Sequence, residues 1–98
     1  MEKHTPHYKL STIKILMDTG QVRSTQSALS GAVSLGFDFQ GMCAVIATLT
    51  SADFYKSMTT HTNHRIWQDV YRPVTDLGEV YIKLTVLDDV LIVSFKEL

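Results

Sequence analysis

The 98-residue chain has one cysteine, two prolines and no long hydrophobic run, and its formal net charge is −1. The single Cys43 excludes an internal disulfide and is compatible with a reducing cytoplasm. The apolar stretch Met42–Leu49 is far shorter than the ~20 residues that a membrane helix needs, so no membrane association is expected. Without a basic excess, any anion-binding surface has to be a local one.

What is present is enough apolar sequence for one core. Hydrophobic residues make up 45% of the chain, which argues against disorder, and the length suits a single domain over residues 1–98. The first half has helical periodicity, and three helices are expected there. Their boundaries follow from Thr5-Pro6 and Gly20 for the first, Ser24 or Thr25 and Gly36 for the second, and Asp38 at the start of the third.

The second half changes to the period of two that is typical of strands. Four strands are expected, at about Tyr55–Thr60, Ile66–Arg72, Glu79–Leu87 and Val90–Lys96. The connections between them are short, which favours an antiparallel meander. Helices first and strands second predict an α+β fold, with the N-terminal helices packed on one face of a C-terminal antiparallel sheet.

The last two strands allow a prediction of side-chain neighbours. If the chain turns at Asp88-Asp89, Tyr81 faces Lys96 and Lys83 faces Ser94 on a polar side. The opposite, apolar side then contains the pairs Ile82–Phe95, Leu84–Val93 and Val86–Leu91. A phenol and an ammonium held together on two strands suggest a functional site, because strands fix side chains better than loops do.

The same register argument extends across the sheet. A turn placed symmetrically between Pro73 and Gly78 sets Val70 opposite Tyr81 and Gln68 opposite Lys83. It also sets Trp67 opposite Leu84 and Asp69 opposite Ile82, so a carboxylate on the apolar side needs a partner. If Thr60 pairs with Ile66, Lys56 falls opposite Val70. The predicted row therefore reads Lys56, Val70, Tyr81, Lys96, with Gln68 and Lys83 beside it.

This cluster of lysines, a phenol and an amide, with no carboxylate or histidine expected on the same patch, suits a phosphate. RNA can be cut without a metal when its 2′-hydroxyl attacks the adjacent phosphorus, which needs a proton acceptor, cations and a proton donor. Clustered positive charge lowers the pKa of lysines and phenols in general toward the range that such chemistry needs. On the pattern alone, a merely solvated polar face remains the simpler interpretation.

Several long blocks of the sequence resemble the motility quorum-sensing regulator (MqsR) toxin family. They are Asp53-Phe-Tyr-Lys-Ser-Met-Thr-Thr60, Ile66-Trp-Gln-Asp-Val-Tyr-Arg-Pro73, Val80-Tyr-Ile-Lys83 and Asp89-Val-Leu-Ile-Val-Ser-Phe-Lys-Glu97. The resemblance implies a RelE-like α+β fold and a bacterial type II toxin. It further implies ribosome-independent endonucleolytic cleavage of mRNA, with a preference for GCU sites. The implied partner is an antitoxin of the MqsA type, which has a zinc-binding N-terminal domain and a DNA-binding C-terminal domain.

The resemblance also assigns a site. The family's proposed catalytic residues match Lys56, Gln68, Tyr81 and Lys96, and the same polar surface offers Lys83, Arg65 and Arg72 for RNA binding. No metal or other cofactor is expected, because His61 and His64 have no cysteine or carboxylate set to complete a metal site. The alternative function is a non-catalytic RNA- or protein-binding module on the same fold.

Overall fold

The computed structural model describes residues 1–98, and it has an α+β fold. The sheet follows the order β1-β3-β4-β6-β7-β2, and β5 pairs with β6 at its side. Every pairing is antiparallel except that of β2 with β7. The elements are β1 (Glu2–Lys3), α1 (Leu10–Asp18), β2 (Val22–Ser24), α2 (Gln26–Leu35), α3 (Phe39–Ala47), a 3-10 turn (Ser51–Asp53), β3 (Phe54–Thr59), β4 (Trp67–Tyr71), β5 (Val74–Thr75), β6 (Gly78–Val86) and β7 (Val90–Glu97).

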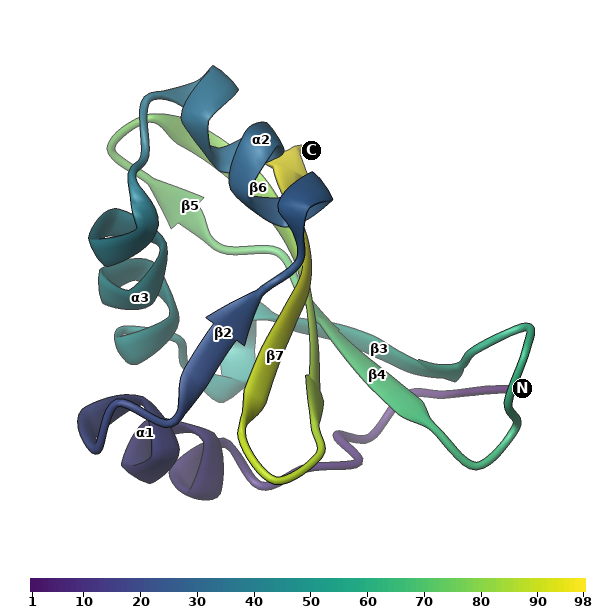
Figure 1. The fold of residues 1–98 in the computed structure, drawn as a ribbon. Coiled ribbons are helices and arrows are strands. Elements are labelled where there is room, and N and C mark those ends of the chain that lie inside the picture. The colour runs from purple at the N-terminus through teal and green to yellow at the C-terminus, as the bar shows by residue number, and fades with distance from the viewer.

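The predicted fold class and the four-strand meander β3-β4-β6-β7 are therefore confirmed. The short strands β1, β2 and β5 were missed, because segments of two or three residues show no alternation. In Figure 1 the helices gather on one side of the sheet, while the β3–β4 hairpin projects away from them. The N-terminal segment runs back along that hairpin (Figure 1).

Thr25 is the one of the two candidate caps that begins the second helix, and Asp38 caps the third helix as predicted. The Thr25 hydroxyl accepts a hydrogen bond from Ala28 N at 3.0 Å, and Asp38 Oδ1 accepts one from Gly41 N at 2.7 Å. Gly36 ends α2 with φ of 101°. The predicted start of the first helix was wrong. α1 begins at Leu10, because residues 1–9 pack along the β3–β4 hairpin instead of coiling.

No single helix is long and apolar enough to cross a membrane. Only α2 and α3 taken together reach such a length and composition, and they are bent by 89° at the break between them.

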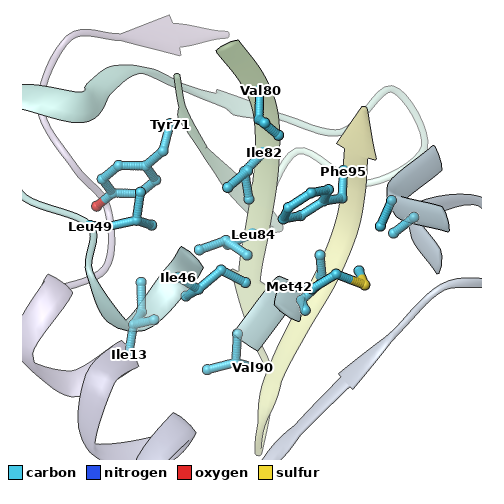
Figure 2. Packing of buried hydrophobic residues seen from close by; sticks show 13 residues of the cluster. Ile13, Met42, Ile46, Leu49, Tyr71, Val80, Ile82, Leu84, Val90 and Phe95 are labelled. Atoms are coloured by element: carbon cyan, nitrogen blue, oxygen red, sulfur yellow. The ribbon is translucent and has the colours of Figure 1, made fainter. Parts of the chain in front are cut away.

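One buried cluster joins the helices to the inner face of the sheet. Figure 2 shows Ile46 of α3 next to Leu84 of β6, and Ile13 of α1 belongs to the same cluster. Helix α2 lies directly on β7, since a Cβ atom built at Gly31 would collide with the carbonyl oxygen of Phe95. This close contact fixes the strand next to Lys96. On the opposite face of the sheet no helix covers Lys56, Tyr81 and Lys83, which are partly exposed. The cluster consists of Ile13, Ala28, Ala32, Met42, Ile46, Leu49, Tyr71, Val80, Ile82, Leu84, Val90, Ile92 and Phe95.

The β6–β7 hairpin has the predicted register in its outer half only. Tyr81 pairs with Lys96, Ile82 with Phe95 and Lys83 with Ser94, as expected. Beyond them the predicted pairs Leu84–Val93 and Val86–Leu91 were wrong, and the observed pairs are Leu84–Ile92 and Val86–Val90. The cause is a β-bulge, in which Val93 is an extra residue that the alternation does not reveal.

The β4–β6 register differs from the prediction by two residues. Val70 pairs with Lys83, Asp69 with Leu84 and Tyr71 with Ile82. The turn between these strands lies at Asp76-Leu77, because β5 extends the hairpin with Thr75 paired to Gly78. The four predicted pairs Trp67–Leu84, Gln68–Lys83, Asp69–Ile82 and Val70–Tyr81 were therefore wrong. A shift of two residues nevertheless leaves every side chain on its predicted face.

Candidate active site

The open face of the sheet has Tyr81 at the edge of a lysine cluster. Lys96 lies opposite Tyr81 on β7, and its Nζ is 5.2 Å from the centre of the phenol ring. Lys83 follows two residues later on the same strand, with Nζ 5.9 Å from that ring. The predicted row Lys56, Val70, Tyr81, Lys96 was wrong. Because of the two-residue shift, the row reads Lys56, Val70, Lys83, Ser94.

Lys83 therefore occupies the middle of the cluster. Val70 beneath it is fully buried without belonging to the core cluster, as expected where lysine stems cover an apolar side chain on the open face. Burial, followed by the charges of Lys96 and Lys56, lowers the pKa of Lys83 from its usual value. Neither Lys83 nor Lys96 has a carboxylate partner.

Lys56 has a partner that the sequence did not reveal. The carboxylate of Glu2 lies 2.7 Å from Lys56 Nζ, so the expectation of a patch without a carboxylate was wrong. The pairing of β1 with β3, in which Glu2 is opposite Met58, brings the start of the chain to this place. The Glu2 hydrogen bond raises the pKa of Lys56, and Lys56 in turn lowers the pKa of Glu2. Lys56 is thus held as an ammonium group.

A buried carboxylate anchors this N-terminal segment. Asp69 is fully buried and accepts hydrogen bonds from the backbone N–H groups of His7 (3.1 Å) and Tyr8 (2.9 Å) and from Ser57 Oγ (2.6 Å). These three donors are the partners that its place on the inward face demanded. Trp67 lies on the same face of the sheet as Asp69, as predicted. His7, whose N–H donates to Asp69, stacks its ring on the Trp67 indole with 5.2 Å between the ring centres.

The other predicted site residues, Gln68, Arg72 and Arg65, lie at different places relative to Tyr81 and the lysines. Continuing the β4–β6 register places Gln68 beyond Lys83, rather than beside Tyr81 as predicted. The same register brings Arg72 level with Tyr81, because Val80 N donates to the carbonyl of Pro73 at 3.0 Å. Arg65 lies in the exposed loop at the far end of the β3–β4 hairpin, away from the cluster.

Two histidines of that exposed loop were considered as possible metal ligands. His61 and His64 are exposed, and no group of three or more His, Cys, Asp or Glu side chains gathers anywhere in the structure.

The lowered pKa of Lys83 predicts a pH-dependent cost in stability. Between the lowered pKa and the usual 10.5, the unfolded chain binds more protons than the folded one, so stability rises with pH there. At pH 7 both states are protonated and the full cost is present. We expect Lys83→Met, which keeps an apolar stem over Val70, to raise the free energy of unfolding at pH 7 by about 0.5 kcal/mol, a value discounted for solvent screening.

Urea unfolding of the parent and Lys83→Met at pH 7 and above pH 10.5 would measure this difference, which should shrink at the higher pH. Lys14→Met, on helix α1 and away from the lysine cluster, is the matched control for the same substitution. A Lys83→Met protein that is less stable than the parent at pH 7 would contradict the assignment.

The open sheet face has a phenol and several cations, of which only Lys56 is ion-paired. Such a surface is typical of proteins that bind the phosphate backbone of a nucleic acid. Comparison with known families agrees: the profile described as "Motility quorum-sensing regulator, toxin of MqsA" matches residues 5–97. The chain belongs to this toxin family. It is 63% identical over 97 residues to the mRNA interferase toxin MqsR of Escherichia coli (strain K12), covering 99% of each chain.

Proposed function

We propose that this chain is the toxin of a toxin–antitoxin pair and that it cuts mRNA at the Tyr81 cluster. It is an endoribonuclease of the mRNA interferase class, as the name of its Escherichia coli relative supports. The observation that carries the location of the site is the pairing of Tyr81 with Lys96 on adjacent strands, with Lys83 beside them and Lys56 held as an ammonium by Glu2.

The proposed reaction is transfer of the phosphoryl group within the RNA. The 2′-oxygen forms a bond to phosphorus while its proton passes to the oxygen of Tyr81, which reacts as the phenolate and becomes the neutral phenol. The bond from phosphorus to the 5′-oxygen breaks, and that oxygen takes a proton from Lys56 Nζ. Lys96 and Lys83 stabilise the negative charge that develops on the phosphate oxygens. The products are a 2′,3′-cyclic phosphate and a 5′-hydroxyl, and no metal is required.

Tyr81 is the best candidate for proton transfer, with Lys56 as the alternative base, and the raised pKa of Lys56 supports the first assignment. Because its pKa is raised, Lys56 carries a proton and has no lone pair free to accept one from the 2′-hydroxyl, which leaves it the donor role. Tyr81 is therefore our candidate for the acceptor.

The other predicted residues are proposed to bind RNA on either side of the reacting phosphate. Gln68, beyond Lys83, would hydrogen-bond the chain on one side, and Arg72 would contact it on the other. Arg65 would meet only a longer RNA that reaches the hairpin loop. We further propose a preference for GCU sites, independence of the ribosome and action in the cytoplasm, where mRNA is found. The partner is an antitoxin, which the family description calls MqsA.

Incubating the purified protein with a defined mRNA in excess EDTA tests the proposal. We expect discrete fragments that end in 2′,3′-cyclic phosphate, identified by their mass. Because this mixture contains no ribosomes, the same result would support cleavage that is independent of the ribosome. Loss of all cleavage in EDTA, with recovery on adding Mg²⁺, would contradict a metal-independent reaction. Intact RNA with measurable binding would favour the non-catalytic module instead.

A further inference from the structure

We propose that Tyr55 and Arg72 form a nucleobase-stacking subsite beside the Tyr81 cluster; this rests on the proposed function, since it assigns a place to the RNA substrate. Tyr55 lies in β3 and Arg72 directly follows the end of β4. The two side chains lie against each other, with the Arg72 guanidinium carbon 4.6 Å from the centre of the Tyr55 ring. Planar guanidinium groups and aromatic rings are the surfaces on which proteins stack unpaired bases.

A β-bulge is what places Tyr55 on this surface. Phe54 pairs with Tyr71 and Lys56 pairs with Val70, so Tyr55 is an extra residue with no partner on β4. Phe54 points inward, where its ring meets the Tyr71 ring edge-on at 5.5 Å. The Tyr55 side chain points out instead, and 44% of the residue's surface is exposed. The Tyr55 ring therefore does not belong to the buried core, and it lies exposed beside the lysine cluster.

Arg72 is held in place by its backbone, while its guanidinium is left free. Its N–H donates to the carbonyl of Asp53 at 2.7 Å, which ties it to the start of β3. The guanidinium has no carboxylate within ion-pairing distance, so its charge is available to a ligand. Lys56 Nζ is 5.5 Å from the same Tyr55 ring, which links the subsite to the catalytic lysine.

The subsite has room for a base and lies next to the proposed reaction centre. A surface hollow of about 240 Å³ opens beside it, and Tyr55, Arg72, Asp53 and Glu79 contribute to its walls. Arg72 is level with Tyr81 on the adjacent strand, and Lys96 is level with Tyr81 on the next. An RNA chain whose phosphate lies between Lys83 and Lys96 would therefore place a neighbouring base over Tyr55 and Arg72.

The test uses an octamer of 2′-O-methyl RNA, which cannot be cut because its 2′-oxygens are blocked, and a set of copies with one abasic residue at each position in turn. We expect Tyr55→Leu to weaken binding of the intact octamer about tenfold. For the parent protein, one abasic position should weaken binding by a similar factor. In the Tyr55→Leu protein, that same abasic position should have no further effect, whereas the other positions behave as before.

Conservative variants separate stacking from charge and from damage to the fold. Tyr55→Phe keeps the ring and should bind within about twofold of the parent. Arg72→Lys keeps the charge but loses the planar face, so affinity should fall while the salt dependence of binding stays the same. Arg72→Ala should in addition reduce the slope of log Kd against log salt by about one.

Parental affinity of Tyr55→Leu, or a loss that is the same at every abasic position, would overturn the subsite. If the parent protein cuts RNA but no abasic position depends on Tyr55, the subsite is wrong and the proposed ribonuclease stands. Coupling at one position in a protein that never cuts RNA would support the subsite and contradict the proposed ribonuclease.

Discussion

Replacing Tyr81 by phenylalanine should slow RNA cleavage by about a hundredfold or more, because the change removes only the oxygen that accepts the proton. Lys56→Ala should cause a loss of similar size by removing the proton donor. Single-turnover cleavage of end-labelled RNA at saturating protein measures this step directly. The loss for Tyr81→Phe should appear in the rate at saturation and not in the affinity, since the ring that packs beside Lys96 and Lys83 remains.

Tyr71 offers a matched control for the same chemical change on the opposite face of the sheet. Its side chain belongs to the core, and burial raises its pKa to about 12. Tyr71→Phe should therefore cut RNA at close to the parental rate. Lys14→Ala on helix α1 is the corresponding control for Lys56→Ala. Near-parental cleavage by both Tyr81→Phe and Lys56→Ala would remove the proposed mechanism.

Replacing Asp69 by alanine should lower the free energy of unfolding by about 3 kcal/mol. The substitution leaves the N–H groups of His7 and Tyr8 and the hydroxyl of Ser57 without their acceptor. Such a loss is a large part of the stability of about 5–15 kcal/mol that is typical of a small domain. Urea unfolding gives the change as a shift of the midpoint at constant slope.

The same variant should also loosen the N-terminal segment. Amide hydrogens of His7 and Tyr8 should exchange faster with solvent than in the parent, because their acceptor is gone. Asp69→Asn keeps an oxygen acceptor and should lose about half as much stability. Asp76→Ala, in the exposed β5–β6 turn, should change stability by less than about 0.5 kcal/mol. An unchanged urea midpoint for Asp69→Ala would show that the carboxylate does not anchor this segment.

Local rules predicted the parts of the fold that depend on neighbouring residues. Thr25, Gly36 and Asp38 were recognised as caps because capping involves residues only a few positions apart. The same kind of rule failed at Thr5-Pro6, which reads as a helix start but belongs to the segment along β3 and β4. Contacts between the N-terminal segment and the strands β3 and β4 overruled the local preference there.

In the candidate site, too, local patterns predicted some features and contacts between distant segments decided the others. Alternation along each strand correctly put Tyr81, Lys83 and Lys96 on one face. It could not say which residue between the start of β4 and Pro73 lies beside Tyr81, because a shift of two residues gives the same alternation. The turn at Asp76-Leu77 decided that question in favour of Arg72 and moved Gln68 away.

By itself, the sequence determined the α+β class and the shared face of Tyr81, Lys83 and Lys96, since alternation and capping are properties of short segments. Long blocks of matching sequence determined the family. Only the tertiary structure decided how that set is arranged. The bulge at Tyr55 and the two-residue register shift depend on how strands meet. The Glu2–Lys56 pair joins residues 54 positions apart, a contact that the path of the whole chain creates and no local pattern encodes.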